Sequence, residues 1–146
     1  MQANRRRDSG PEIRIRNLLH AAGLRYRVDR RIGAGASACR PDIVFGPARV
    51  AVFIDGCFWH SCPVHGHVPQ VNRDYWAPKL ARTVERDKRQ VAILGEMGWE
   101  VLRIWEHEDA ASAADRIRHV VVGRRTALTI APASARRGAS GALPAA

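Results

Sequence analysis

The chain has 146 residues, which suits one domain with a substantial core and is short for two. Twenty-four Lys and Arg against fourteen Asp and Glu give a formal net charge of +10 and a pI near 11.1. This excess favours a polyanionic partner, because neutralised phosphates release condensed counterions. A solvated basic surface enriched in arginine by codon bias would give the same totals, so charge alone leaves both interpretations open.

Hydropathy and cysteine content bear on where the protein works. No apolar segment approaches the length of a bilayer span, and residues 1–7 lead into no hydrophobic signal region. Three cysteines, two of them in one short loop, argue against a disulfide framework and agree with a reducing compartment. We therefore expect a cytoplasmic protein with no membrane association.

The first element in the chain is a predicted helix. Residues 1–8 are polar and basic and predict a flexible N-terminal arm. Ser9, Pro11 and Glu12 then form the pattern of a capping box, with Ser9 as N-cap and Glu12 reaching back to it. Gly23 is expected to end the helix. Its expected buried stripe is Ile15, Leu18, Leu19 and Ala22.

Three strands are predicted next. Residues 24–32 alternate loosely between apolar and basic positions, which is typical of an edge strand. Pro41 can open a strand but not occupy its centre, so Asp42 falls at the start of the second strand. After the Gly46-Pro47 turn, residues 50–54 are apolar at every position, which indicates a central strand covered on both faces.

The second half of the chain predicts helix, strand and helix. Residues 72–95 form a long helix with Trp76, Leu80, Val84, Val91 and Leu94 on one side. Gly98 ends that helix, residues 100–105 form the next strand, and a helix follows over 109–122.

Composition divides the chain into three parts. After Arg124 it collapses to Ala, Ser, Gly, Pro and Arg, which cannot bury enough apolar surface to order itself. We therefore predict an arm over residues 1–8, one folded domain over 9–124, and a disordered tail over 125–146.

The central strand leads into a loop dense in reactive side chains. Cys57, Cys62 and His65 have the spacing of one half of a tetrahedral zinc site. His107 is the expected fourth ligand, since the strand before it could return to the same edge of the sheet. Buried free cysteines beside surface histidines are the alternative. Cys39 lies apart from this loop and is expected to serve packing.

These residues together resemble a known family. The run GCFWH, followed closely by Cys and His, then Trp76, then VERDKR and then GWEVLRIWEH, is similar to the very-short-patch repair (Vsr-type) endonucleases, which nick DNA beside a T:G mismatch. The resemblance covers about Pro11 to His107. It implies an α/β fold with a restriction-endonuclease-like αβββαβ core, a mixed central sheet flanked by helices, and a structural zinc loop.

The resemblance also implies catalytic roles. Asp42 would bind Mg²⁺ together with a main-chain oxygen near Ile54, and His60 would act as general base. An acidic residue at the place of Glu12 lies beside the active site in the family, although capping alone would also explain Glu12. For His60 the alternative is zinc ligation in place of His65 or His67.

The chain departs from the family pattern at Asp55 and in the ligands of the zinc loop. Asp55 stands where the best-known members carry histidine and where the wider superfamily carries a catalytic lysine. A carboxylate there could bind metal or orient His60 but cannot replace a cation, and an Asp-Gly turn is the alternative explanation. In the zinc loop, Cys62 and His65 replace a His-x-Cys pair, and His107 replaces the final cysteine. Two Cys and two His still make a closed structural site.

Phe58, Trp59 and Trp76 match the family's aromatic wedge, which inserts into the duplex near the mismatch. Packing in the core is the alternative. The arm over residues 1–8 is shorter than the family's, which puts tight clamping of the mismatch in doubt.

The sequence therefore predicts a Mg²⁺-dependent endonuclease with a structural Zn²⁺, which nicks double-stranded DNA beside a T:G mismatch and works as a monomer. Two alternatives stay open: a related restriction-like or defence endonuclease without mismatch specificity, and a zinc-stabilised DNA-binding module without catalysis.

Overall fold

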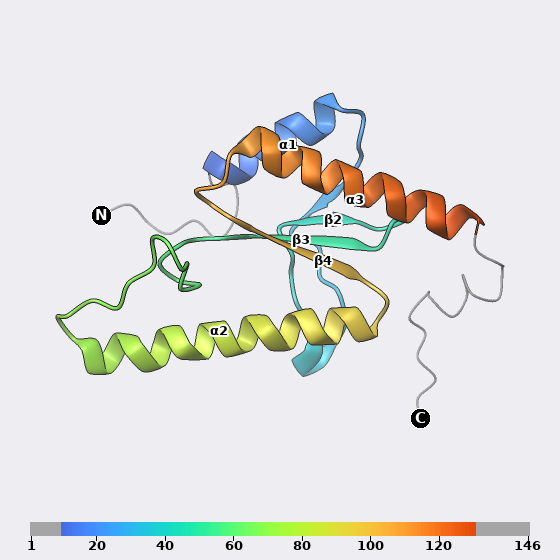
Figure 1. Ribbon diagram of the computed structural model, residues 1–146. Helices are drawn as coiled ribbons and strands as arrows, with labels where there is room; N and C mark the ends of the chain where they lie inside the picture. Colours follow the sequence, from blue (N-terminus) through green and yellow to red (C-terminus); the bar gives the residue numbers. More distant parts are fainter. Residues whose placement is uncertain (1–9, 131–146) are drawn as a thin grey trace.

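A computed structural model describes residues 10–130 of the chain. In chain order the elements are α1 (Gly10–Ala21), β1 (Arg27–Val28), the 3-10 helix η1 (Gly35–Ser37), β2 (Ile43–Phe45), β3 (Val50–Asp55), α2 (Arg73–Glu96), β4 (Glu100–Trp105) and α3 (Ala110–Ile130). This series confirms the predicted αβββαβ core. Figure 1 shows the sheet between α1 and α3 on one side and α2 on the other.

The sheet is mixed, as predicted, with strand order β1-β2-β3-β4. The first three strands pair antiparallel, whereas β3 and β4 run parallel with Asp55 opposite Trp105. Because these two strands point the same way, the loops that follow them leave from one edge of the sheet. The loop carrying Cys57 and the turn carrying His107 therefore start side by side.

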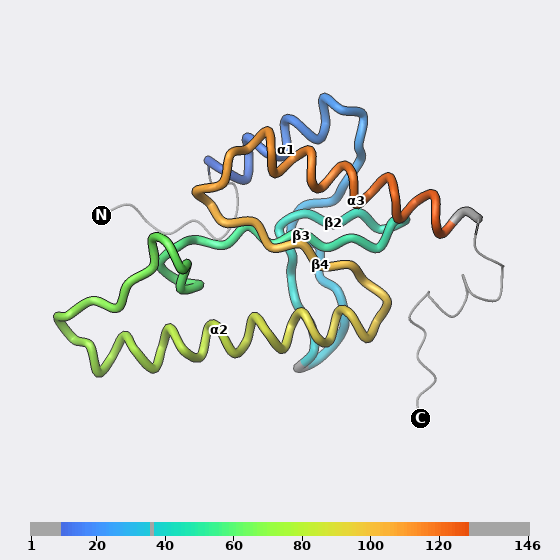
Figure 2. The backbone as a smooth tube through the Cα atoms, in the orientation of Figure 1, coloured from blue at the N-terminus to red at the C-terminus, as the bar shows by residue number. Residues whose placement is uncertain are grey.

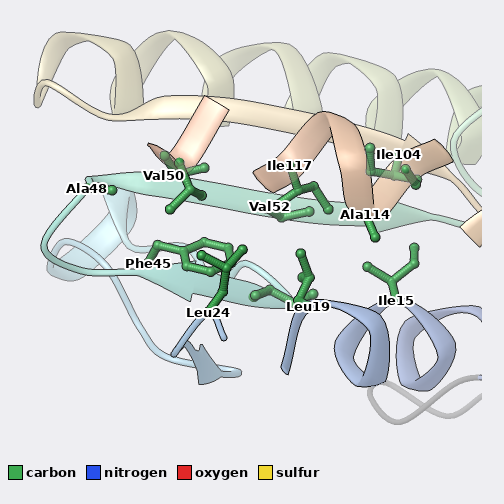
Figure 3. Packing of buried hydrophobic residues seen from close by; sticks show 13 residues of the cluster. Ile15, Leu19, Leu24, Phe45, Ala48, Val50, Val52, Ile104, Ala114 and Ile117 are labelled. Atoms are coloured by element: carbon green, nitrogen blue, oxygen red, sulfur yellow. The ribbon is translucent and has the colours of Figure 1, made fainter. Parts of the chain in front are cut away.

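Both faces of β3 are buried, which confirms its central position. Val50 and Val52 belong to the larger core, which α1 and α3 complete, and Figure 3 shows this packing. Ala51 and Phe53 face the other way and pack with Leu94 of α2 in a second core. The strand thus joins two hydrophobic layers, and its last residue continues the alternation toward α2.

Fewer residues of the N-terminal helix α1 are buried than the sequence predicted. Ile15 and Leu19 are buried, but Leu18 is 41% exposed and Ala22 is exposed, so their assignment to the core was wrong. Ile15 and Leu19 lie one turn apart and form the contact line, and the other two residues lie to one side of it. Gly23, with φ at 85°, follows the helix end as predicted.

The edge strand is much shorter than the predicted range 24–32. Only Arg27 and Val28 form it, because Asp29 adopts a left-handed conformation with φ at 54° and interrupts the extended chain.

α2 matches its predicted range within one residue at each end. Asn72 precedes it with φ at 58°, and Gly98 follows it with φ at 87°. Leu80 and Leu94 of its predicted apolar stripe are buried, whereas Val91 is 38% exposed.

The last helix extends beyond its predicted end. Asp109 caps it by accepting hydrogen bonds from the Ser112 backbone N–H and hydroxyl, which lower the pKa of Asp109. The helix was expected to stop at Val122 but continues to Ile130. Arg124 explains the difference, since its guanidinium donates to three carbonyl oxygens, those of Ala48, Arg49 and Gly98. The domain boundary expected at 124 therefore falls inside α3.

Some predictions lie outside the described residues: the N-cap at Ser9, the arm over 1–8, and the tail from 131 onward. Among the helices of residues 10–130, none is both long and apolar enough to cross a bilayer.

Candidate active site and metal cluster

Four predicted metal ligands converge at the edge of the sheet. One ligand atom from each of Cys57, Cys62, His65 and His107 lies within 4.8 Å of the other three. His107 Nδ1 is 3.1 Å from Cys57 Sγ and 3.7 Å from Cys62 Sγ, and His65 Nδ1 is 4.0 Å from Cys57 Sγ. Sulfur and nitrogen ligands of a tetrahedral Zn²⁺ are about 3.6 Å apart, from bond lengths of about 2.3 and 2.0 Å. The cluster can therefore hold a metal ion of this kind.

The loop that carries three of these ligands is tightly wound. The Cys62 N–H donates to the Cys57 carbonyl oxygen at 2.9 Å, and the Gly66 N–H donates to the Cys62 carbonyl oxygen at 2.8 Å. A Cβ at Gly66 would lie 2.6 Å from that oxygen and 2.7 Å from the Cys62 nitrogen. Only glycine fits this turn, which brings His65 back toward the two cysteines.

The two thiols of the cluster differ in their ease of ionisation. Burial raises the pKa of Cys57, as do the neighbouring Cys62 and Glu106. Burial also opposes ionisation of Cys62, but hydrogen bonds from the backbone near His65 and from the Cys57 thiol outweigh it and lower the Cys62 pKa.

His60 lies apart from the cluster and faces α2. Its Nδ1 is 2.5 Å from Oδ2 of Asp87 and 3.7 Å from Oδ1 of Asp55. His67 packs its ring against Phe58. These positions favour a catalytic role for His60 over the alternative of metal ligation. A histidine whose Nδ1–H donates to a carboxylate has Nε2 left to accept a proton.

Asp55 makes a two-pronged ion pair. Arg103 Nε donates to its Oδ2 at 2.7 Å, and Arg103 Nη2 donates to its Oδ1 at 2.9 Å. The same Nη2 lies 3.2 Å from Oδ1 of Asp87. The guanidinium also lies over the Phe53 ring, 4.4 Å from its centroid. The guanidinium of Arg103 thus places a positive charge beside Asp55, the position where the wider superfamily carries a lysine.

Asp42 directly precedes β2, and its N–H donates to the Val52 carbonyl oxygen of β3 at 2.9 Å. Its Oδ2 accepts a hydrogen bond of 2.7 Å from the Ile54 N–H, so Asp42 and the backbone of Ile54 are in direct contact. The pKa of Asp42 is raised to about 6, chiefly by burial and in smaller part by the charges of Glu12 and Asp55, whereas the Ile54 hydrogen bond and the Arg103 charge lower it. Like charges gathered in this way are a feature of cation sites.

Glu12 is buried at 2% exposure, with Arg16 Nη1 3.9 Å from its Oε1. Its charge acts on Asp42, so α1 brings an acid to the candidate site. The capping explanation requires Ser9, which lies outside the described residues.

The three aromatic residues form one cluster outside both cores. Phe58 contacts Trp59 and Trp76 edge to face, with ring centroids 5.2 and 5.3 Å apart, and the two indoles are 5.7 Å apart. All three are partly exposed. The ammonium of Lys79 lies 5.5 Å from the Trp59 ring and 5.6 Å from the Trp76 ring. Figure 2 shows the backbone of the β3–α2 loop beside the N-terminal part of α2.

Sequence reasoning missed Asp87 and Arg103. Asp87 continues the apolar spacing of α2 at three residues after Val84 and seven before Leu94, so an acid on the buried stripe was a usable signal. Arg103 is the one charged residue within the apolar run 101–105. Its register opposite Phe53 places it on the face toward α2.

Known proteins resemble the chain along most of its length. The family model described as DNA mismatch endonuclease Vsr matches residues 1–65. The type II nicking enzyme V.NaeI of Lentzea aerocolonigenes is 50% identical over 129 residues, covering 84% of this chain and 77% of that enzyme. The type II nicking enzyme V.XorIIP of Xanthomonas oryzae pv. oryzae is 38% identical over 125 residues, covering 83% of this chain and 88% of that enzyme. The DNA mismatch endonuclease Vsr of Escherichia coli K12 is 39% identical over 111 residues, covering 73% of this chain and 66% of that enzyme.

Fold, site and relatives together define the class of protein: the chain is a DNA endonuclease with a restriction-endonuclease-like core. It belongs to the family of the DNA mismatch endonuclease Vsr, which confirms the resemblance found in the GCFWH, VERDKR and GWEVLRIWEH motifs.

Proposed function

We propose that the chain uses Mg²⁺ to hydrolyse one phosphodiester bond in one strand of duplex DNA, next to a T:G mismatch. The observation that carries the proposal is the contact of His60 with Asp87 and its approach to Asp55, whose charge acts on Asp42. Phe58 and Trp59, in the same loop as His60, belong to a partly exposed aromatic cluster. The names of the relatives, nicking enzymes and a mismatch endonuclease, support single-strand cleavage and mismatch recognition.

His60 is the general base of the proposed reaction. Its Nδ1–H donates to Asp87, which fixes the tautomer and the orientation of the ring. Nε2 then accepts a proton from the attacking water. A base held in this way contributes about 10²–10⁴-fold to the rate.

Asp42 is the proposed side-chain ligand of Mg²⁺, with the main-chain oxygen of Ile54 as its neighbour. The donor set fits, because Mg²⁺ prefers oxygen ligands and keeps several waters, so few protein ligands suffice. Bound Mg²⁺ would stabilise the charge that develops on the phosphate. The negative charge of Glu12 also acts on Asp42.

Zn²⁺ is the proposed occupant of the Cys57, Cys62, His65 and His107 cluster. Its role is structural, since four protein ligands leave no open position for substrate or water. Three of the four come from the loop that carries His60 and Trp59, so the bound ion would fix the base and the aromatic residues together.

The cluster of Phe58, Trp59 and Trp76 is the proposed mismatch reader. Unstacking a mismatched step costs less than unstacking a matched one, and an inserted aromatic face recovers part of the lost stacking. Lys79, held over two of these rings, adds positive charge where a duplex would approach.

A nicking assay tests the proposal. Purified chain is incubated with a matched duplex and with its T:G counterpart, each labelled on both strands, with and without Mg²⁺. We expect a single cut in one strand of the T:G duplex, dependent on Mg²⁺ and lost in Asp42→Ala and His60→Ala. Equal cutting of the matched duplex would favour a restriction-like or defence endonuclease instead. A monomer acting in the cytoplasm completes the proposal.

A further inference from the structure

His60 faces two acceptors and has one proton to give them. Nδ1 is 2.5 Å from Asp87 and 3.7 Å from Asp55. A neutral imidazole donates through a single N–H, so the two carboxylates compete for the same hydrogen bond. The carboxylate that accepts this hydrogen bond determines the angle of the His60 ring and the direction in which Nε2 points.

Arg103 is placed to decide this competition. It occupies both oxygens of Asp55, at 2.7 and 2.9 Å, and its Nη2 also approaches Asp87 at 3.2 Å. Its position is fixed twice, by the parallel register of β4 with β3 and by the stacking of the guanidinium over Phe53. Asp55 is thereby held in place while Asp87 keeps one oxygen for the imidazole.

We propose that Arg103 is a positioning residue, which holds Asp55 away from His60 so that Asp87 alone orients the base. The proposal rests on the proposed role of His60. It assigns Asp55 a place in an ion pair with Arg103 and not in the metal site, since both carboxylate oxygens already accept hydrogen bonds. Without the guanidinium, Asp55 would turn to the imidazole and pull the ring out of line.

The alternative is an ion pair that only stabilises the fold. Both roles predict a less stable protein when Arg103 is replaced, because an acid is left buried without its partner. They differ in what a second substitution does. If Arg103 only stabilises the fold, removing Asp55 as well does not alter the orientation of His60. If Arg103 restrains Asp55, removing Asp55 makes the guanidinium unnecessary for cleavage.

The test is a double-mutant cycle with Arg103→Gln, Asp55→Asn and the double variant. We measure the single-turnover nicking rate and the Kd for the T:G duplex in the presence of Mg²⁺, and the free energy of unfolding. We expect Arg103→Gln to lower the rate at least about tenfold with little change in Kd. Asp55→Asn and the double variant should stay within about threefold of the original rate, so that the second substitution rescues the first.

A spectroscopic readout keeps the test independent of cleavage. The proton between His60 Nδ1 and Asp87 should give a downfield imidazole ¹H resonance in the original chain, in Asp55→Asn and in the double variant. In Arg103→Gln that resonance should shift or disappear. Arg116→Gln is the matched control, because this arginine donates to the Arg103 carbonyl from an exposed position. It should leave the rate and the resonance unchanged.

Three results would overturn the inference: an unchanged rate in Arg103→Gln, a double variant no faster than Arg103→Gln, or loss of cleavage in Asp55→Asn alone. If Arg103→Gln does not fold, Arg103→Lys replaces it, with the same rescue by Asp55→Asn required. Failure of the proposed function is distinguishable, since the original chain would then not nick any duplex while the resonance of His60 could still follow the expected pattern.

Discussion

His60 Nδ1 and Asp87 Oδ2 lie 2.5 Å apart, although the two residues belong to different elements and are 27 positions apart in the chain. Asp87→Asn would keep the shape of this contact but could force the wrong tautomer on the imidazole. We expect the single-turnover nicking rate to fall by about 10²–10⁴-fold. The Kd for DNA should change little, and rates within about threefold of the original would contradict the proposed role of Asp87.

Asp42 should make stability depend on pH. Its pKa is about 6 in the folded chain against 3.8 for an unperturbed aspartate. The folded chain therefore holds the extra proton, and the stabilisation is fully present below pH 3.8 and lost as the pH rises through about 6. Asp42→Asn is neutral throughout and can still accept from the Ile54 N–H. At pH 8 it should raise the free energy of unfolding by about 1–2 kcal/mol, with the gain vanishing toward pH 4.

Urea unfolding in magnesium-free buffer, with zinc retained, measures this effect. Asp115→Asn is the control, because the Asp115 side chain is 77% exposed and its replacement should change the free energy of unfolding little. The same Asp42→Asn chain should be inactive in nicking. A gain that persisted unchanged at pH 4 would show that the raised pKa is not its cause.

The Cys/His cluster should bind one equivalent of Zn²⁺ per chain. Cys62→Ala would remove a ligand and leave three, so we expect loss of bound zinc, measured by mass spectrometry, and destabilisation of several kcal/mol. Cys39→Ala is the matched control, since this buried cysteine lies in the second core and outside the cluster. Loss of zinc from both variants alike would count against the ligand assignment.

Substitutions at two glycines test whether the metal loop requires glycine at position 66. Gly66→Ala places a Cβ 2.6 Å from the Cys62 carbonyl oxygen and should distort the metal loop, with loss of zinc affinity and of nicking. Gly95→Ala in α2 meets nothing within 4 Å and should stabilise the chain by about 0.5–1 kcal/mol. Thermal unfolding with zinc quantification checks both, and a harmless Gly66→Ala would refute the close approach.

Trp59 should contribute to DNA affinity by stacking. Trp59→Ala is expected to weaken binding of the T:G duplex by about 1–3 kcal/mol, measured by fluorescence anisotropy. Trp59→Phe should retain part of the affinity because it keeps an aromatic face. If Trp59→Ala binds as tightly as the original chain while remaining folded, the aromatic cluster is not the mismatch reader.

Much of the fold could be predicted from local patterns. The apolar run 50–54 identified the central strand because alternation disappears when both faces are buried. Glycines at 23 and 98 marked helix ends because left-handed backbone excludes most other residues. The metal cluster followed from close spacing in one loop and from a parallel return of the next strand.

The remaining features depend on tertiary contacts that no short pattern encodes. The end of α3 is set by Arg124, whose carbonyl partners come from two other parts of the chain. The spacing of α2 marks Asp87 as an acid on the buried stripe, but only the tertiary contact shows that its partner is His60. Arg103 likewise stands out as a charge in an apolar run, but its partner Asp55 lies on another strand and is found only in the structure.

α2 carries Trp76 near one end and Asp87 about three turns further along, so about 16 Å of continuous helix separates the two. If Trp76 contacts the mismatched base step as proposed, the length of the helix sets the distance from that step to the bond that is cut. Deleting one residue between them would rotate Asp87 by about 100° about the axis. Such a protein should still bind the duplex, but Asp87 would no longer contact His60. Cleavage would therefore be lost and would not move to a neighbouring bond.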